Sequence, residues 1–504
     1  MKKIITAALA CAMIISSLCA CGQEQPGTEP ATLPEKYSLA DEGLLTPPEN
    51  DPSIVGMCLF FSLLDSCESN LIKGGYETAH ELNLSEAYQY YCTFSFDEDR
   101  DSGEDGYYIG NDRQDTTNCL GPTFSEMLAQ VSMFANGCGP VDESVIGFDA
   151  AASIVDDMDM TDMNSAHTSG SIEKYMGEYL LTGIDFNCDC FFEPVYQNAS
   201  TEEMKRSILE NGAAAVQTTT AQSNIRKSEA GIAYYQNNYP EDIIYEYMNH
   251  SVSVVGWDDS FSRENFGYIK PENDGAWLVR DNCRKYGEYY YWISYEQLLA
   301  AFVTVDFGLR EDYGDILYYD SIGMKNSIKA EGGETVAANV FTVDEDCTLS
   351  AVGVPTSAQD QPVTVEVYRN PDKDMPDSGV CAAVLETTIH KPGYHVVDLD
   401  EAVKLSEGDS FSIVIRYPAD STGANEWLGR VPVEGEYRQY AGDIIDMAEH
   451  YGFELECVLT SAPGQSYVVY DGKWYDTSEP ATAELFGLDV TLNNFGIKAL
   501  MEKE

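Results

Sequence analysis

The sequence predicts an α+β part followed by an all-β sandwich. The chain has 504 residues, more than one hydrophobic core usually organises. Up to about residue 310, apolar runs at helical spacing precede short apolar strands. From about residue 311 onward, short alternating runs are separated by turn residues, which is typical of a β-sandwich. These runs predict strands that include residues 336–343, 363–368, 411–417 and 495–499. We therefore expect two domains, residues 41–310 and residues 311–504.

The N-terminus is typical of an export signal. A charged start, Met1-Lys2-Lys3, is followed by an apolar stretch that is too short to serve as a stable membrane anchor. Residues 18–21, Leu-Cys-Ala-Cys, resemble a bacterial lipobox. This resemblance implies that residues 1–20 are a lipoprotein signal peptide and that Cys21 carries the lipid, which anchors an exported protein to the outer face of the bacterial cell membrane. Residues 21–40 are expected to form a flexible stalk.

Several elements of the α+β part follow from apolar spacing. Apolar residues from Leu59 to Leu71 repeat at helical spacing and stop at Gly74-Gly75, which predicts a helix that starts at Cys58. Other helices are expected at residues 123–136 and 201–211, and strands at residues 213–216, from His250 onward and around Trp277. The runs at residues 156–164 and 234–247 are expected to be surface insertions. The second of these is either a variable loop or a wall of the substrate cleft.

A cysteine and a histidine occupy chemically informative positions in this pattern. At a helix N-terminus, unpaired N–H groups and the positive end of the helix dipole would stabilise a thiolate at Cys58. His250 heads an apolar strand and could hold its imidazole against that sulfur. The alternative is structural, since a cysteine is often a small buried apolar residue and a lone histidine often only supports a strand end.

Four motifs carry a resemblance to a known family. Residues 56–62, Gly-Met-Cys-Leu-Phe-Phe-Ser, are similar to Gly-Ser-Cys-Trp-Ala-Phe-Ser, and residues 84–86 match a Leu-Ser-Glu segment. Residues 249–252 resemble Asn-His-Ala-Val, and residues 275–282 resemble Gly-Ala-Trp-Leu-Val-Lys-Asn-Ser. The chain thus resembles papain-like cysteine peptidases, in the bacterial form with a C-terminal lectin-like domain. The resemblance implies hydrolysis of a peptide or protein substrate, with Cys58 as nucleophile and His250 as its base.

The third catalytic position departs from the family pattern. The ungapped match places Asp281 where the family has the asparagine that orients the imidazole, and Asn282 follows it. Neighbouring strand side chains point to opposite faces, so only one of the two can reach His250 without a bulge. The register favours Asp281, and Asn282 is the alternative orienting residue. An aspartate can fix the imidazole tautomer, as in serine-peptidase triads.

The oxyanion position also departs from the pattern. The family's glutamine before the nucleophile is missing, and Asn50 or Asp51 stands in that region. A carboxylate repels a developing oxyanion, and loss of one donor costs about 100- to 1000-fold in rate. The sequence therefore also supports a second hypothesis, a catalytically degenerate papain-like protein that binds peptide or glycan at the cell surface.

Charge and cysteine spacing restrict the partners. Lys+Arg 29 against Asp+Glu 85 gives a net charge of -56, which repels nucleic acid and anionic lipid. We expect no nucleic-acid partner, and membrane contact only through the lipid. Residues 97–106 have part of a calcium-loop spacing, but a solvated acidic loop is favoured. The Cys188-Asp189-Cys190 segment lacks metal-site spacing, so we expect no metal site and no cofactor.

The second part adds a possible binding function. Segments at residues 337–341, 393–399 and 461–467 resemble the lectin-like domain found behind bacterial papain-like modules. Trp427 or Trp474 either stacks on a glycan or belongs to the core. Outside the export segment and the nucleophile, ten cysteines remain of the 14, and their connectivity cannot be derived from sequence.

Overall fold

The computed structural model describes most of the chain from residue 32 onward. The described residues are 32–48, 58–86, 88–89, 94–96, 106–109, 124–144, 177–188, 199–220, 224–237, 248–284, 286–320, 323, 326–331, 333–434, 455–458, 461–488 and 491–503. Residues from Leu33 onward belong to one compact unit. Cys21, Asn50 and Asp51 lie outside the described residues, as do residues 97–105 of the acidic loop and the insertion at residues 156–164.

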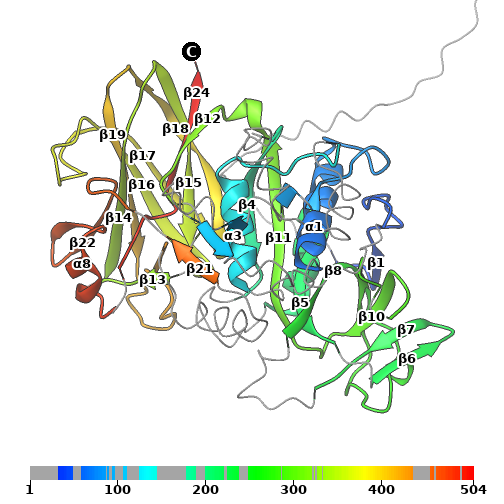
Figure 1. Cartoon of the computed structure of the whole chain (residues 1–504). Coiled ribbons are helices and arrows are strands. Elements are labelled where there is room, and N and C mark those ends of the chain that lie inside the picture. The colour runs from blue at the N-terminus through cyan, green and yellow to red at the C-terminus, as the bar shows by residue number, and fades with distance from the viewer. Residues whose placement is uncertain are drawn as a thin grey trace, which may run out of the picture. The chain divides into compact units, whose positions relative to one another are not determined.

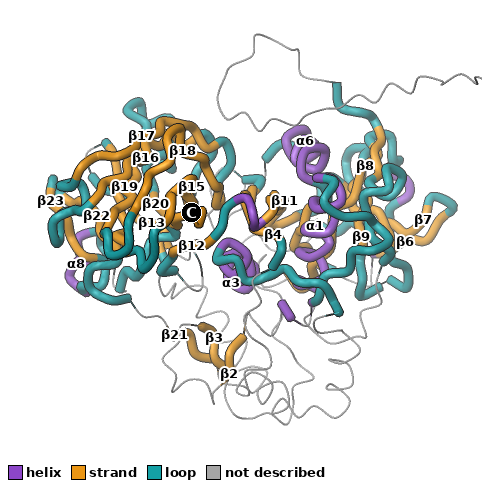
Figure 2. Tube along the Cα trace, turned by 90° about the horizontal axis from the view of Figure 1, so that it is seen from above, coloured by secondary structure: helices purple, strands orange, loops and turns teal. Residues whose placement is uncertain are grey.

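Three helices agree closely with the spacing of apolar residues, namely α1 (Cys58–Gly74), α3 (Phe124–Ala135) and α6 (Thr201–Asn211). The described residues also include the short helix α8 (Pro480–Leu485), which was not expected from the sequence. Helix α6 starts with a capping box, in which Ser200 accepts from the backbone N–H of Glu203 and Glu203 accepts from that of Ser200. Helices α1, α3 and α6 all pack against strands of the large sheet (Figure 2).

One large mixed sheet dominates the described chain (Figure 1). Its path runs through β12 (Asp315–Leu317), β24 (Lys498–Lys503), β15 (Cys347–Thr356), β18 (Gly393–Leu405), β4 (Tyr179–Phe186), β11 (Leu299–Leu309), β5 (Ala214–Thr219), β8 (Met248–Asp258), β9 (Ala276–Arg280), β10 (Tyr290–Ser294), β7 (Gly231–Tyr234) and β6 (Ile225–Ser228). Strand β18 pairs with β4, so one sheet joins segments on both sides of residue 310.

A second sheet makes the C-terminal part a sandwich. Its order is β17 (Val380–Ile389), β16 (Gln361–Arg369), β19 (Ser410–Pro418), β14 (Glu334–Thr342), β22 (Ser466–Tyr470) and β23 (Lys473–Asp476). Buried residues of β15, β18 and β24 share one apolar core with those of β14, β16 and β19. Smaller sheets pair β13 (Asn326–Ile328) with β20 (Val431–Val433), and β2 (Phe94–Phe96) with β3 (Gly106–Ile109) and β21 (Leu455–Val458). Two 3-10 turns lie at Arg263–Asn265 and Arg310–Asp312.

Helix α1 is the centre of the first part. All its residues from Cys58 to Leu71 are buried, and it packs against β5, β8 and β11. Leu59, Leu63 and Leu64 join a core with side chains of β4 and β11. A second core gathers around Trp257 and Trp277 on β8 and β9. The predicted fold class, an α+β papain-like part followed by an all-β lectin-like sandwich, is confirmed.

The start of the folded unit differs from the expected stalk. Strand β1 (Lys36–Ser38) pairs antiparallel with β8, with Ser38 opposite Gly256. The indole of Trp257 also donates to the carbonyl of Pro34 at 3.0 Å. These residues therefore belong to the folded unit, because the edge of β8 offers backbone partners that composition cannot reveal.

Within the part of the chain that the structure describes, no helix combines the length and the apolar character needed to cross a membrane.

Candidate active site

Cys58 is the first residue of α1, and its sulfur is buried. Its side chain is only 6% exposed. The first turn of the helix contains no acidic residue, so no carboxylate there opposes a negative charge at the helix N-terminus. The Cys58 side chain is hydrogen-bonded to those of Cys283 and His250, and the backbone N–H of Ser251 also donates to it. The start of α1 thus places a buried thiol beside His250 and Ser251, which lie near the start of β8.

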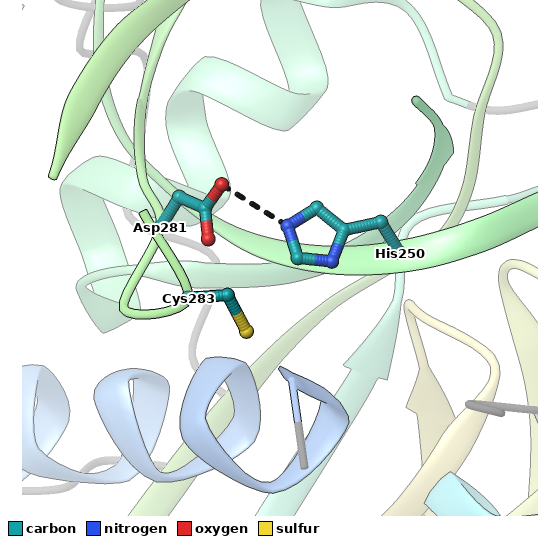
Figure 3. Close-up of side chains that lie close together, drawn as sticks. All are labelled: His250, Asp281 and Cys283. Carbon is teal, nitrogen blue, oxygen red and sulfur yellow. Dashed lines mark ion pairs between the residues drawn. The ribbon is translucent and has the colours of Figure 1, made fainter. Parts of the chain in front are cut away.

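His250 and Asp281 come from neighbouring strands and form a buried pair. His250 lies on β8, and Asp281 directly follows β9, which pairs antiparallel with β8. His250 Nε2 lies 3.1 Å from Asp281 Oδ2, as the dashed line in Figure 3 shows. Because the carboxylate lies at Nε2, Nδ1 is the ring atom left for the hydrogen bond between His250 and Cys58.

The electrostatics favour a thiolate and an imidazolium. Burial alone lowers the pKa of His250, but the charge and hydrogen bonding of Asp281 outweigh it and raise the pKa to about 10. The hydrogen bond from Cys283 is the largest cause that holds the pKa of the Cys58 thiol well below its ordinary value. Burial opposes this shift, while the hydrogen bond and charge of His250 add to it. Both directions stabilise the same ion pair.

Asn282 faces a different partner. Its amide donates to Asp65 Oδ1 of α1 at 3.2 Å, whereas its neighbour Asp281 faces His250. The two side chains therefore diverge at the point where the chain leaves β9 and enters a turn. Asp281, and not Asn282, therefore lies beside the imidazole of His250.

A buried ion pair ties β9 to α1 next to this site. Arg280 forms a two-pronged contact with Asp65, in which Arg280 Nε donates to Asp65 Oδ2 at 2.8 Å and Nη2 donates to Oδ1. Arg280 Nη1 also donates to the carbonyl of Thr46 at 3.0 Å. Ser253 of β8 donates to the same Asp65 carboxylate. The network connects α1, which carries Cys58, to β8, which carries His250, and to β9, which Asp281 directly follows.

Glu68 extends the network by one turn of α1. It accepts from the backbone N–H of Leu84 at 2.9 Å and from the hydroxyl of Thr46. Its carboxylate lies 3.8 Å from Arg280 Nη2. Burial raises the pKa of Glu68 to about 7, and the opposing charge of Arg280 only partly offsets this effect.

Cys283 was not expected at the site. A turn closed by the bond from Arg284 N–H to the Asp281 carbonyl, 3.0 Å long, follows β9. This turn brings Cys283 back, so that its sulfur lies within 4.8 Å of ligand atoms of both His250 and Asp281 (Figure 3). A cysteine two residues beyond the orienting position was a usable signal, but only the turn decides which way it points.

Some of the other predicted site residues lie outside the described residues, and two predicted tryptophans are partly exposed. Asn50, Asp51 and Cys21 lie outside the described residues. Trp474 packs beside Val336 and Ala338, and its indole donates to Asp377 at 2.8 Å. Trp427 lies under the guanidinium of Arg430. Both tryptophans are partly exposed, so the choice between glycan contact and core stays open.

The fold belongs to one class, a papain-like domain joined to a lectin-like sandwich. Residues 316–500 match the family model of the lectin-like domain. The chain resembles a structure of the clostridial cysteine protease Cwp84 after propeptide cleavage, at 19% identity, with 93% of this chain and 99% of that chain covered and a TM-score of 0.66. It also resembles the cysteine protease and lectin-like domains of Cwp84, a surface layer associated protein of Clostridium difficile, at 19% identity, 96% and 91% coverage and a TM-score of 0.65. No curated protein sequence matches the chain.

Proposed function

We propose that this protein is a cysteine peptidase. The observation that carries the proposal is that three buried groups lie side by side. The Cys58 thiol is hydrogen-bonded to the His250 imidazole, whose Nε2 lies 3.1 Å from the Asp281 carboxylate. The similarity in fold to a cysteine protease supports the same reading. Cys58 is the nucleophile, His250 the acid and base, and Asp281 the residue that orients His250.

The reaction follows from the ion pair. The Cys58 thiolate attacks the carbonyl carbon of the scissile peptide bond, and backbone N–H groups at the start of α1 stabilise the negative oxygen. His250 then donates the Nδ1 proton to the leaving amine, and the C–N bond breaks to leave a thioester on Cys58. Next, His250 takes a proton from water, whose oxygen attacks the thioester. The acid product leaves and the thiolate returns.

An exported, lipid-anchored location is part of this proposal. The lipobox-like residues 18–21 support lipidation of Cys21. The surface-layer association stated for Cwp84 is consistent with a place outside the cell. Carbohydrate binding by residues 316–500 is a further proposal, supported by the match to the lectin-like family model.

An electrophilic peptide probe tests the catalytic proposal. An epoxysuccinyl peptide is expected to form one adduct, on Cys58, detected by peptide mass spectrometry. The Cys58→Ala variant is expected to lose both adduct and peptide hydrolysis, while Cys381→Ala, which removes an exposed thiol of β17, keeps both. If intact, folded protein forms no adduct at Cys58, the non-catalytic peptide-binding or glycan-binding hypothesis replaces the peptidase.

A further inference from the structure

Four side chains with metal-binding atoms meet at the candidate active site. The ligand atoms of His250, Asp281 and Cys283 lie within 4.8 Å of one another. Cys58 joins them through hydrogen bonds to Cys283 and His250. Both sulfurs are thiols rather than halves of a disulfide. Figure 3 shows the imidazole of His250, the carboxylate of Asp281 and the thiol of Cys283 close together. The Cys58 thiol reaches this group from the start of α1.

The chemistry of this set selects one kind of ion. Calcium and magnesium prefer shells of oxygen ligands, and only one carboxylate is present. Thiolate and imidazole together suit zinc, and sites with two cysteines, one histidine and a free fourth position are known for it. The set therefore favours a thiophilic divalent ion over a hard cation.

Tetrahedral coordination requires short separations between the ligand atoms. Zinc binds sulfur at about 2.3 Å and nitrogen at about 2.0 Å, so neighbouring ligand atoms are about 3.5 to 3.8 Å apart. Side chains already in hydrogen-bond contact need only small rotamer adjustments to reach such distances. The Cys58 side chain is hydrogen-bonded to those of Cys283 and His250, and the ligand atoms of Cys283 and His250 lie within 4.8 Å of each other.

Asp281 occupies the place of an outer carboxylate. Histidines that bind zinc usually donate their second ring N–H to a carboxylate, which fixes the tautomer and strengthens the ligand. Asp281 lies 3.1 Å from Nε2 of His250, which leaves Nδ1 as the ring nitrogen available to a metal ion. The orientation of the imidazole therefore suits a metal ion between His250 and the two sulfurs.

We propose that Cys58, Cys283 and His250 form a Zn²⁺ site, with Asp281 as its outer carboxylate and a fourth position open to water. Because the metal binds thiolates and a neutral imidazole, binding of Zn²⁺ releases the protons that these ligands carry. The ion caps the Cys58 sulfur and reversibly blocks its reactions. The site shares residues with the proposed peptidase, but metal binding does not require peptidase activity.

Metal titration of the whole mature chain tests the site without substrate. Metal-free protein, kept reduced by a phosphine, is titrated with Zn²⁺ and separately with Co²⁺ as a spectroscopic probe. Wild type is expected to bind one Zn²⁺ that protects both Cys58 and Cys283 from alkylation. The Co²⁺ complex is expected to show a tetrahedral spectrum with a thiolate-to-cobalt band, and Cys283→Ser halves that band.

Variants separate the ligands from their surroundings. Cys283→Ser is expected to weaken Zn²⁺ binding by more than the about 10- to 100-fold that loss of an outer carboxylate costs, and Asp281→Asn by about that amount. Cys381→Ser, which removes an exposed thiol elsewhere, is the matched control and keeps full affinity. Thermal unfolding of each variant verifies the fold.

Two results overturn the proposal. One is equal Zn²⁺ affinity of Cys283→Ser and wild type, and the other is a wild-type Co²⁺ complex without a two-thiolate band, which needs no variant. Zinc binding without peptidase activity would remove the proposed function and leave the site intact. Peptidase activity in a protein whose Cys58 is not protected by zinc would remove the metal site and leave the proposed function intact.

Discussion

At the scale of single residues, each ionisable group at the site depends on a neighbour. Asp281 keeps His250 protonated, and the pKa of His250 rises to about 10 although burial works against it. Cys283 and His250 together lower the pKa of Cys58. Another cysteine of the same helix, Cys67, shows the opposite behaviour, because burial raises its thiol pKa well above the ordinary value. The lowered thiol pKa of Cys58 therefore depends on its partners Cys283 and His250.

The first prediction concerns the alkylation of Cys58. Its thiolate persists as the pH falls, because a lowered pKa keeps the group ionised below the ordinary thiol value of about 8.5. At roughly pH 6, iodoacetamide is expected to label Cys58 well before Cys67, as measured by peptide mass spectrometry over time. Labelling of Cys58 that appears only above the ordinary thiol pKa would argue against the ion pair.

The second prediction separates Asp281 from Asn282. Asp281→Asn removes the charge that raises the pKa of His250, so the imidazolium is lost at a lower pH and the alkaline limb of kcat/KM moves down from about 10. Asn282→Ala is the matched control, since Asn282 bonds to Asp65 and not to His250. The assignment is wrong if the control moves the alkaline limb and Asp281→Asn leaves it in place.

At the scale of elements, a buried charge network holds α1 against two strands. Arg280 of β9 binds Asp65 and lies 3.8 Å from Glu68 of the same helix. Ser253 of β8 donates to Asp65 as well. Such networks are costly to break, because loss of one partner leaves an uncompensated buried charge. The helix that carries Cys58 is therefore fixed to β8 and β9, which carry His250 and lead to Asp281.

The third prediction concerns stability and pH. In the folded protein, burial raises the pKa of Glu68 from 4.5 to about 7, so the native state binds more protons than the unfolded chain between these values. Glu68 thus contributes stability that is fully present below about 4.5 and is lost as the pH rises through about 7, by roughly 3 kcal/mol. Glu68→Gln is expected to remove this slope from the free energy of unfolding, measured by denaturant titration.

A control variant tests whether the position matters. Glu210→Gln removes one negative charge from an exposed position of α6. If this control changes the pH slope as much as Glu68→Gln does, net charge and not the buried network sets the dependence.

At the scale of the whole molecule, the large sheet joins the papain-like and lectin-like parts. Gly393 of β18 pairs with Asp185 of β4, and His395 Nε2 lies 2.9 Å from Asp185 Oδ1. Gly393 has φ 146, and a Cβ there would lie 1.9 Å from the carbonyl oxygen of Ile184. Only glycine allows this approach, so this part of the pairing requires glycine at position 393.

The fourth prediction tests that junction. Gly393→Ala is expected to disrupt the pairing of β18 with β4, because the new methyl group collides with the Ile184 backbone. Calorimetry should then show a lower melting temperature and a separation of the transitions of the two parts. Gly408→Ala is the matched control, since φ is also positive at 84 but nothing lies within 4 Å of the added Cβ.

The control defines the contrary outcome. Gly408→Ala should cost only about 1 kcal/mol, the typical penalty for a non-glycine residue in this backbone region. If both variants melt alike, with one transition, the close approach at Gly393 does not hold the two parts together.

Local patterns determined much of the fold and part of the site. Helical spacing from Leu59 to Leu71 predicted α1 with Cys58 at its start, and alternation predicted β14, β16 and β19. Strand β17 was missed, because it is a largely exposed edge strand without a clear apolar face. Strand β24 was expected at residues 495–499 and instead spans Lys498–Lys503. Periodicity reports which face of an element is buried, and it is weakest where little is buried.

Only the tertiary structure decided which elements meet. The sequence alone determined a thiol at a helix start, a histidine on a strand and two candidates, Asp281 and Asn282, beyond the next strand. The packing of α1 against β8 and β9 separated those two candidates, one toward His250 and the other toward Asp65. The turn after β9 brought Cys283 to the same place. The physical reason is that spacing along a chain encodes burial, whereas the partner of a buried group is selected by long-range packing and by the need to compensate each buried charge.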